Sequence, residues 1–399
     1  ICNKLFCIPG SDSIHEIADC FKINPMNNAD IVNFCKEHKI DFVVVGPELP
    51  LSNGIVDKLS EEKITVFGPD KASSQLESSK IFMKNICKNH NVPTAKYSFF
   101  DNEKKALDFL DTVDFPTVIK ADGLAAGKGV IIAKNKNEAV ETIKNIMSKR
   151  IFGTSGENII IEEFLEGEEI SFFALVDTNG FILPLTTAQD HKKIGEGDTG
   201  LNTGGMGAYS PVPFIKQNQI NDFVIKFVKP VIKDLKHNNI FFSGIFYAGL
   251  ILTKYGPKLL EINVRFGDPE AQAVLPRLKA DLLDLLLASS KGRLDQLKSP
   301  EWDNNFCINV VMASKGYPES YKKNTIIGGL NKTTVNKSQY IFHSSTRKNE
   351  DHWLATGGRV LSISALGSTL KEARNKAYNV INEIDWKSGY YRNDIGWKH

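Results

Sequence analysis

The chain has 399 residues, of which 42% are hydrophobic and 24% are charged, a composition typical of a globular protein with two or three cored domains. Lys and Arg number 49 against 47 Asp and Glu, so the formal net charge of +2 gives no electrostatic reason to expect nucleic acid or an acidic membrane as a partner. The six cysteines include no C-x-x-C pair, no apolar run approaches the roughly 20 residues of a membrane span, and no signal-peptide pattern is present. We therefore expect a cytoplasmic protein.

The first part of the chain alternates between predicted strands and helices. Residues 41–45 and 63–67 are short β-branched runs, each closed by a Gly-Pro-acid turn, and are predicted as buried parallel strands. Helical spacing at 28–38 and 54–62 places a helix before each strand. Because ligands bind beyond the carboxyl ends of such strands, the two turns lie where a substrate is expected. Residues 5–10 read as a strand and turn from the middle of such a unit, so we expect that the chain starts late.

The pattern becomes strand-rich after a predicted helix at 78–90. This second region is predicted as α+β. Its strands are expected at 115–120, 130–133, 158–162 and 170–176 and in a hairpin of 245–252 with 258–264, and its helices at 137–149, 223–236 and 280–288. A third segment begins near 299–300, with expected strands at 307–313 and 359–364 and an expected helix at 369–384.

A glycine-rich loop follows Lys120, which ends one of these predicted strands. The loop carries three glycines and Lys128 and leads into a strand at 130–132, whereas a Walker P-loop leads into a helix. Such a hairpin loop can close over a nucleoside triphosphate, with its backbone N–H groups and Lys128 facing the phosphates and Lys120 holding the inner ones. A flexible surface hairpin is the alternative, and the two well-placed lysines favour phosphate binding.

An acidic turn at Gly167 separates the predicted strands 158–162 and 170–176. A strand that ends in a hinge can present backbone groups to an adenine edge, while Glu162 accepts from the adenine amino group and Glu169 from ribose hydroxyls. Acidic side chains in a turn are more often simply solvated. On its own, this segment therefore leaves nucleotide binding and a solvated turn both open.

The strongest chemical signal is the predicted strand at 258–264. Side chains alternate between the two faces of a strand, which makes one face apolar and the other polar. The apolar side chains are Leu260, Ile262 and Val264, and the polar ones are Glu261, Asn263 and Arg265. The carboxylate and amide oxygens are hard ligands suited to Mg²⁺, and the guanidinium can bind a phosphate or a carboxylate. A strand with a solvated polar face is the alternative.

Six stretches of the chain together resemble one protein family. In chain order they are VVVGPELPLSNGIVD, FGPDKASSQLESSK, KADGLAAGKGV, IIEEFLEGEEISF, AQDHKKIGEGDTGLNTGGMGAYSP and LLEINVRFGDPEAQAVLPRLKADL. They resemble the phosphoribosylamine–glycine ligases of the ATP-grasp superfamily, and KADGLAAGKGV with NTGGMGAYSP is specific to that family. The resemblance implies an α/β plus α+β architecture, the ATP-grasp fold. Its implied parts are a truncated Rossmann-like N-terminal domain at 1–79, an ATP-grasp domain at 80–290 with a mobile ATP lid at about 98–165, and a C-terminal closing domain at 295–399.

The resemblance also implies an activity. Members of the family use ATP to ligate glycine to 5-phosphoribosylamine through a glycyl phosphate, and they release glycinamide ribonucleotide, ADP and phosphate in the second step of purine synthesis. The implied cofactors are ATP and Mg²⁺, or Mn²⁺, and the implied partners are the two small-molecule substrates. We expect a monomer that binds neither nucleic acid nor a membrane.

The motif matches imply roles for individual residues. The implied ATP contacts are Lys80, Lys120, Gly127, Lys128 and Gly129 at the phosphates, Glu162, Glu163, Phe164 and Leu165 at the adenine, and Glu169 at the ribose. The implied metal ligands are Glu261 and Asn263. The implied substrate pocket comprises Glu48, Asp190, Asn202, Gly204, Gly205, Met206 and Arg265, with Asp190 at the glycine amine. Within these sets, the implied catalytic residues are Arg265, Lys120 and Asp190.

The chain departs from the family pattern in two places. Leu201 stands where the family usually has proline, which loosens the loop but leaves Asn202 and the glycines intact. The family's first strand and its Gly-Gly-Arg-Glu-His loop, which helps to hold the phosphoribosylamine phosphate, are absent, so we expect that roughly two dozen residues of a first βα unit are missing. The alternative to a ligase is therefore an ATP-binding protein of the same fold with impaired or no ligase activity.

The sequence shows no Ser/His/Asp or Cys/His constellation, which agrees with a reaction that needs no protein nucleophile. His191 lies beside two lysines, and we expect it to be an orienting or surface histidine rather than a base. A carboxylase-type or formate-using ATP-grasp enzyme is a further reading, and the TGGMGAYSP segment argues against it.

Overall fold

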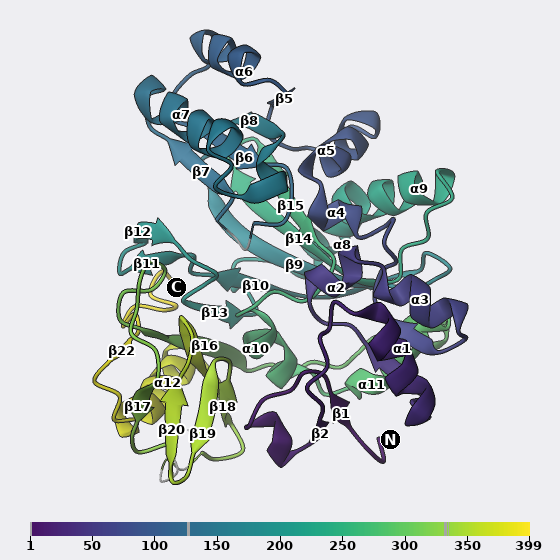
Figure 1. Ribbon diagram of the computed structural model, residues 1–399, viewed down its shortest axis with the longest axis vertical. Coiled ribbons are helices and arrows are strands. Elements are labelled where there is room, and N and C mark those ends of the chain that lie inside the picture. Colours follow the sequence, from purple (N-terminus) through teal and green to yellow (C-terminus); the bar gives the residue numbers. More distant parts are fainter. Residues whose placement is uncertain (1, 126–127, 331–332, 334) are drawn as a thin grey trace.

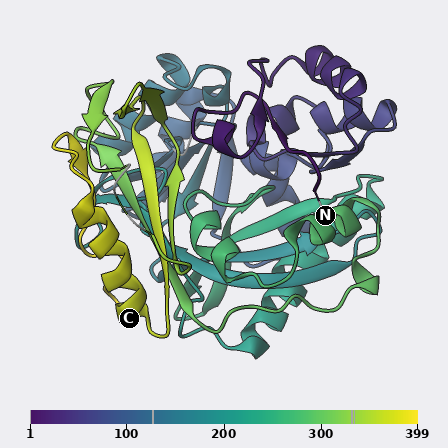
Figure 2. The same cartoon turned by 90° about the horizontal axis from the view of Figure 1, so that it is seen from below.

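The computed structural model describes residues 2–125, 128–330, 333 and 335–399. Figure 1 shows residues 97–163, which we call the lid after the role expected from the sequence, at the top, the N-terminal region at the lower right and the C-terminal region at the lower left. The view from below in Figure 2 separates the yellow-green C-terminal region at the left from the purple N-terminal region at the upper right. Within the described part of the chain, no helix has the length and the apolar character needed to cross a membrane.

The N-terminal region contains two small parallel sheets. β1 (Phe6–Cys7) pairs with β2 (Asp19–Cys20), and β3 (Phe42–Val44) pairs with β4 (Thr65–Phe67), which confirms the predicted parallel pairing. The expected burial of β3 and β4 was wrong, because in this two-stranded sheet only Phe67 is buried and Val44 is exposed. The helices are η1 (Ile14–Glu16), α1 (Asn28–Glu37), α2 (Glu48–Ser52), α3 (Ile55–Glu61), α4 (Gln75–Ser78) and α5 (Lys80–Asn89). The Ser79 hydroxyl accepts from the backbone N–H of Phe82 and caps α5, so this helix begins at Lys80.

The lid is an antiparallel sheet covered on one face by helices. Its strands have the order β5 (Tyr97–Phe100), β8 (Ile159–Glu163), β6 (Thr117–Ala121) and β7 (Val130–Ala133). Its helices are α6 (Glu103–Phe109), η2 (Leu110–Thr112), α7 (Lys136–Ile143), η3 (Lys144–Ser148) and η4 (Gly153–Gly156). Ile119 and Ile161 are buried against these helices, so alternation along β6 and β8 turns Lys120 and Glu162 toward the opposite face of the sheet.

One sheet runs from the ATP-grasp region into the C-terminal region. Its strand order is β15 (Gly256–Asn263), β14 (Gly244–Thr253), β9 (Glu168–Val176), β10 (Ile182–Asp190), β13 (Gly207–Ser210), β16 (Phe306–Ser314), β21 (Arg359–Gly367) and β18 (Gln339–His343), and β22 (Gly389–Tyr390) also pairs with β16. β10 and β13 lie in a stretch where the sequence predicts no strand. They form because both edges of each strand find partners, and the pair β13–β16 joins the two regions.

The hairpin of β14 and β15 confirms the antiparallel pair predicted at 245–252 and 258–264, and it contains a bulge. The register shifts between Gly249, opposite Glu261, and Leu250, opposite Leu259. Leu260 is the extra residue, so the prediction that it shares the buried face of Ile262 was wrong, and Leu259 is the fully buried residue instead. Beyond the bulge the predicted alternation holds.

Helices cover both faces of the central sheet. α8 (Gln217–Phe223), η5 (Val224–Val228) and α9 (Lys229–His237) follow one another directly and pack with α5 on one face, and α11 (Leu282–Ser290) packs on the other. α12 (Leu370–Glu383) covers the C-terminal strands. The remaining elements are α10 (Ala271–Val274), η6 (Leu275–Arg277), η7 (Leu294–Gln296), the hairpin of β11 (Lys193–Gly195) and β12 (Thr199–Asn202), and the sheet of β17 (Thr325–Ile327), β20 (His352–Ala355) and β19 (Thr346–Asn349).

Arg277 anchors the junction between the two regions, and its removal tests this role. The buried guanidinium donates to Ser210 on β13 at 2.9 Å, to Thr186 on β10 at 3.2 Å and to the carbonyl of Asn305 before β16 at 2.8 Å. Arg277→Met leaves these buried acceptors without a donor, so we expect the free energy of unfolding to fall by roughly 3 kcal/mol in urea denaturation. Arg293→Met, at an exposed arginine, is the control, and equal stability of the two variants would contradict the assignment.

Candidate active site

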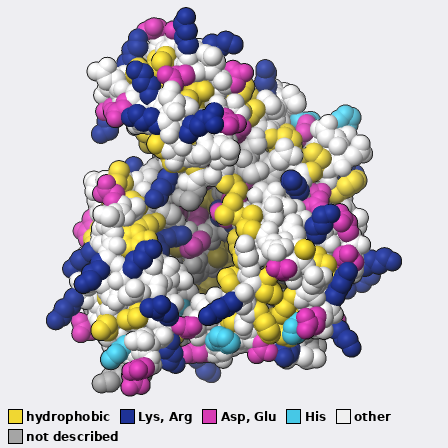
Figure 3. Space-filling view, in the orientation of Figure 1, with side chains coloured by type: hydrophobic (Ala, Val, Ile, Leu, Met, Phe, Trp, Pro, Cys, Tyr) yellow, Lys and Arg dark blue, Asp and Glu magenta, His cyan; other side chains and the backbone are white. Residues whose placement is uncertain are grey.

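The polar residues singled out in the sequence come from several separate segments, and ion pairs and hydrogen bonds connect a number of them. Figure 3 shows a deep hollow in the middle of one face of the molecule, with acidic and basic side chains on its walls. Lys80, in the first turn of α5, donates to the carbonyl of Gly123 at 3.0 Å, and Lys120 on β6 donates to the carbonyl of Leu260 at 3.3 Å. Both lysines therefore bridge the lid and the body of the protein.

Lys192 connects two acidic residues on β9 and β15, two strands of the central sheet that are separated by β14. Its ammonium lies 2.9 Å from the carboxylate of Glu169 on β9 and 3.8 Å from that of Glu261 on β15. The negative charge of Glu169, and then that of Glu261, raises the pKa of Lys192 well above its usual range although burial opposes the shift. Glu169, which is expected at the ribose, and Glu261, which is expected at the metal, thus both lie near the ammonium group of Lys192.

A buried carboxylate lies between two lysines at the base of the lid. Glu162 on β8 pairs with Lys84 on α5 at 3.0 Å and with Lys120 at 2.9 Å, and the side chains of Glu162 and Lys84 are 2% and 0% exposed. Burial alone would raise the pKa of Glu162, but Lys120 and Lys84 outweigh it and hold the pKa below the usual value. Glu162 is therefore ionised and fixes the position of Lys120.

Lys84 is not among the predicted site residues. The available signal was its place on α5 between the apolar residues Met83 and Ile86, on the buried face of an amphipathic helix. A lysine on such a face needs a buried partner of opposite charge, because an unpaired buried ammonium is strongly disfavoured. Glu162, which is distant in sequence, is that partner.

Lys84→Met tests whether this ion pair positions Lys120. Glu162 would keep only one of its two cations, so we expect weaker ATP binding by about tenfold in calorimetric titration, a change equivalent to about 1.4 kcal/mol. Lys88→Met, one turn further along α5 at an exposed position, is the matched control. Unchanged ATP affinity in a folded Lys84→Met protein would show that Lys120 does not depend on this pair.

Glu261 and Asn263 lie on the open face of β15, as predicted. In the described part of the chain no hydrogen bond is found for the Glu261 carboxylate, and its nearest cation is Lys192. Burial raises the pKa of Glu261, but Lys192, Lys120 and Lys80 together lower it below the usual value. Described residues form no group of three or more His, Cys, Asp or Glu that could hold a metal ion. An ionised carboxylate and one amide oxygen fit a Mg²⁺ ion that takes its other ligands from phosphate and water.

Arg265 is held by two carboxylates from the N-terminal part of the chain. Its guanidinium lies 2.8 Å from Glu77 at the end of α4 and 3.3 Å from Glu48 at the start of α2. The second Glu77 oxygen accepts from the backbone N–H of Val264 at 2.8 Å. Burial raises the pKa of Glu77 to about 7 although Arg265 opposes this shift. Glu48 was a predicted site residue, whereas Glu77 was quoted only within a motif.

Asp190 ends β10 beside a loop that approaches it closely. Its Oδ1 atom is buried and has no hydrogen-bond partner among the described residues, and burial, together with the nearby carboxylate of Glu270, raises its pKa well above the usual range. Gly205 has φ +106°, and a Cβ there would lie 2.7 Å from that oxygen and 2.3 Å from Pro269. An unpartnered acidic oxygen in this position is suited to an ammonium group.

Glu270 is a buried acidic residue that the sequence analysis did not single out. It accepts from Ser171 at 2.9 Å and from Tyr247 at 3.1 Å. It therefore adds a second acidic group to the Asp190 side of the cleft. Its only sequence signal was its place in the motif that follows Arg265.

His191 is buried and faces away from solvent. Only 4% of the residue is exposed, and its Nε2 accepts from the backbone N–H of Gly396 at 3.2 Å. Burial and the charge of Arg392 lower its pKa to about 4, so the ring is neutral near pH 7. The alternative of a surface histidine was therefore wrong, and the contact with Gly396 fits an orienting role.

The pH dependence of stability tests this burial. His191 has a pKa of about 4 in the folded protein against an ordinary value of 6.5, so unfolding takes up a proton between these values. The contribution of His191 to the free energy of unfolding is therefore expected to decrease as the pH falls from about 6.5 towards 4, whereas Glu77 and Asp190, whose pKa values are raised, contribute in the opposite direction. His191→Gln keeps an acceptor for Gly396 and is expected to reduce this decrease, whereas His237→Gln, at an exposed position, leaves it unchanged. Equal pH slopes for all three proteins in urea denaturation would refute the assignment.

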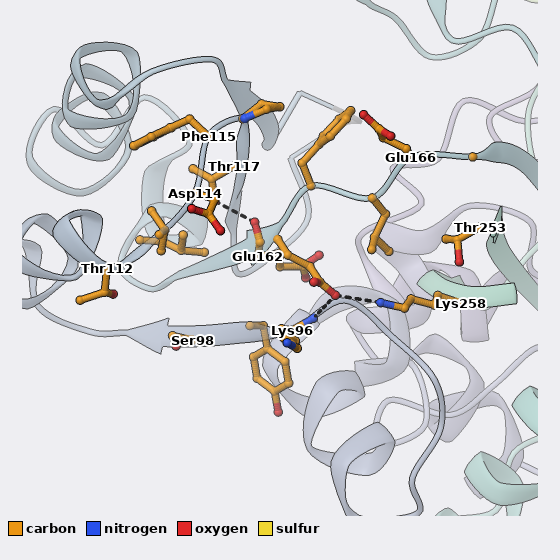
Figure 4. A pocket seen from close by; sticks show the side chains of 18 of the residues that line it. Lys96, Ser98, Thr112, Asp114, Phe115, Thr117, Glu162, Glu166, Thr253 and Lys258 are labelled. Atoms are coloured by element: carbon orange, nitrogen blue, oxygen red, sulfur yellow. Dashed lines mark hydrogen bonds and ion pairs between the residues drawn. The ribbon is translucent and has the colours of Figure 1, made fainter. Parts of the chain in front are cut away.

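The hinge between β8 and β9 lines a pocket of about 880 Å³. Figure 4 shows the pocket, with Lys96 and Lys258 on one side and Phe115 and Thr117 on the other. Glu163 accepts from the backbone N–H of Lys96 and from the ammonium of Lys258, both at 2.9 Å. The predicted adenine contacts Glu162, Glu163, Phe164 and Leu165 line this pocket, whereas Lys80, Lys120, Glu261 and Asn263 do not.

The other predicted residues are divided between the lid loop and the loop after β12. Gly127 lies outside the described residues, and Lys128 and Gly129 precede β7. Asn202 ends β12, and Met206 is fully buried. The Gly204 carbonyl accepts from Arg359 on β21 at 2.6 Å, which ties this loop to the C-terminal region.

Three family models match successive parts of this chain. They describe the N domain of phosphoribosylglycinamide synthetase at residues 1–77, its ATP-grasp (A) domain at 78–271 and its C domain at 307–398. Phosphoribosylamine–glycine ligase of Rhizobium meliloti is 43% identical over 99% of this chain and 92% of its own length. The chloroplastic ligase of Arabidopsis thaliana is 44% identical over 100% of this chain and 76% of its own length.

Solved structures show the same fold. Phosphoribosylamine–glycine ligase from Thermotoga maritima superposes with a TM-score of 0.82 at 29% identity and covers 98% of this chain and 94% of its own. The biotin carboxylase domain of a Hydrogenobacter thermophilus 2-oxoglutarate carboxylase, in complex with MgADP, has a TM-score of 0.73 at 17% identity over 94% of this chain and 82% of its own, a likeness of fold alone. The family models and the full-length relatives agree, and the chain belongs to the phosphoribosylamine–glycine ligase family of ATP-grasp proteins.

Proposed function

We propose that this chain uses ATP to join glycine to 5-phosphoribosylamine, giving glycinamide ribonucleotide, ADP and phosphate. The observation that carries the proposal is that charged groups from distant segments act on one another: burial would raise the pKa of Glu261, but Lys192, Lys120, Lys80 and Arg265 together lower it, and Lys192 also acts on the unpartnered carboxylate of Asp190. Full-length similarity to enzymes of this name supports it. No protein nucleophile is required, since the reaction can proceed by positioning and charge neutralisation.

The proposed chemistry has two stages. The carboxylate of glycine first attacks the γ-phosphate of ATP and gives glycyl phosphate and ADP, which converts a poor electrophile into a reactive acyl group. The amine of phosphoribosylamine then attacks the acyl carbon, and phosphate leaves. Lys120 and Arg265 would offset negative charge on the transferred phosphoryl group, and their ion pairs with Glu162 and Glu77 hold both cations in place beforehand.

Glu261 and Asn263 are the proposed ligands of the divalent metal ion that ATP-grasp enzymes use with ATP. A metal ion bound there would supply further positive charge at the phosphates. We assign Mg²⁺, or Mn²⁺, because the carboxylate and amide oxygens of Glu261 and Asn263 suit hard cations and neither residue carries a soft donor atom. The lysines around Glu261 keep it ionised and so ready to bind a cation.

Asp190 is the proposed contact of the glycine amine. An ammonium group would give its buried oxygen the partner that the protein lacks there and would favour its ionised form. Asn202, Gly204 and Gly205 would line the same pocket, whereas Met206, which is fully buried, would have to act through its neighbours.

The hinge after β8 is the proposed adenine contact, with Glu169 at the ribose and with Lys80, Lys128 and the lid glycines at the phosphates. Of the hinge residues, Glu162 has its carboxylate occupied by two lysines, so the backbone of the hinge is the part free to meet an adenine edge. The domain limits, a monomeric state and a cytoplasmic location stay predictions.

Steady-state ADP release tests the function. We expect release to depend on both glycine and phosphoribosylamine, which separates a ligase from an ATP-binding protein without catalysis. Glu261→Gln and Asn263→Leu are expected to lower kcat by at least about a hundredfold, because each removes one of two metal ligands, and to raise the Mg²⁺ concentration needed for half-maximal rate. Glu319→Gln, at an exposed position, is the control. ADP release without either substrate, or full activity of both variants at limiting Mg²⁺, would refute the proposal.

A further inference from the structure

The hairpin of β11 and β12 sits between two parts of the proposed substrate pocket. Asp190 and Lys192 come directly before this 193–202 hairpin, and Gly204 and Gly205 come directly after it. The backbone N–H of Thr203 closes its base by donating to the Lys192 carbonyl at 2.8 Å. Any movement of the hairpin is therefore passed to residues on both sides of the pocket.

The hairpin cannot hold this position by itself. None of its residues is buried, and its two strands pair only at Lys193 with Asn202 and at Gly195 with Thr199, with a shift of register between them. A two-stranded hairpin without a buried face is at best marginally stable in water. Its position must therefore come from what it packs against.

The last ten residues of the chain supply those contacts, and Figure 1 shows the C-terminus beside β11 and β12. Arg392 is fully buried and donates to the carbonyl of Lys193 and to Asp198, both at 3.0 Å. Its other nitrogens donate to Asp394 at 2.7 and 2.8 Å, and Asp394 in turn accepts from the backbone N–H of Gly197 at 2.7 Å. The buried guanidinium of Arg392 thus contacts the first residue of the hairpin, Lys193, and also Asp198 in the turn between its two strands.

Further contacts between the C-terminal residues and the hairpin lie around the Arg392 guanidinium. Tyr390 donates to the carbonyl of Ile194 at 2.9 Å, and Lys398 pairs with Asp198 at 2.9 Å. Asn393 donates to Glu196 at 2.8 Å. The tail is itself held by Tyr378 on α12, which donates to the Arg392 carbonyl at 2.6 Å, so it is a firm support for the hairpin.

We propose that Arg392 is a positioning residue for the ligase reaction: through Asp198, Asp394 and Lys193 it holds the 193–202 hairpin, and with it the Asp190 and Gly204–Gly205 sides of the substrate pocket. The proposal rests on the proposed function for its catalytic consequence, while the anchoring of the hairpin is independent of it. The proposed ATP contacts lie on α5, the lid and the central sheet, and the hairpin is linked to one of them, Glu169, and to the proposed metal ligand Glu261 through Lys192, which precedes it.

Arg392→Met and the conservative Arg392→Lys test the proposal together, with Asp198→Asn as the variant on the hairpin side. We expect KM for glycine to rise roughly tenfold or more in Arg392→Met, since at least one charge-assisted hydrogen bond is lost, and KM for ATP to rise less, since only Lys192 links the hairpin to the proposed ATP contacts. Arg392→Lys is expected to recover part of the loss, and Asp198→Asn to add little to Arg392→Met because both act on one contact. Arg347→Met, an exposed arginine on β19, is the matched control.

Hydrogen exchange of the backbone amides measures the anchoring directly. We expect faster exchange at 193–202 in Arg392→Met and in Asp198→Asn, with lid exchange unchanged. This readout needs no activity, so it still decides the anchoring if the ligase assignment fails. If Arg392→Met does not fold, Asp198→Asn and Arg392→Lys carry the same comparison. Unchanged exchange at 193–202, or equal changes of KM for glycine and ATP, would overturn the proposal.

Discussion

The structure depends on a carboxylate that is buried between two lysines where the lid meets the body. Glu162 and Lys120 belong to the lid sheet, whereas Lys84 belongs to α5 below it. Lys120 also donates to the carbonyl of Leu260 on β15. Removing one partner of a buried ion pair leaves an uncompensated charge, so the three groups must stay together. The lid is thereby positioned over the strand that carries the proposed metal ligands.

Charge balance in the cleft follows from the same arrangement. Glu261 has cations on several sides and only a 3.8 Å contact with Lys192, so it stays ionised and open. Asp190 has the opposite environment, because burial and a neighbouring carboxylate disfavour its charge. The surroundings of Glu261 thus suit phosphates with a metal ion and those of Asp190 suit an ammonium group, in line with the roles proposed for the two residues.

The continuous sheet explains how the C-terminal region takes part in a site built mainly by other segments. β13 pairs with β10 on one edge and with β16 on the other, so the end of β10 at Asp190 lies next to C-terminal strands. Arg359 on β21 reaches Gly204, and Arg392 reaches the 193–202 hairpin. The sequence pattern alone places a domain boundary between these two regions. It does not reveal that both contribute to one site, because the sheet continues across that boundary.

The sequence by itself determined features that depend on chain neighbours: the parallel strands at Gly-Pro turns, the glycine-rich lid loop, and the alternation that puts Glu261 and Asn263 on one face of β15. Motif resemblance added the family. Tertiary structure alone decided which distant charges meet, because the partner of Lys84 or Arg392 is set by packing and not by spacing along the chain. Tertiary structure also determined that β10 and β13 are strands. Their sequences lack strong strand patterns, and they form because each has a partner strand on both edges.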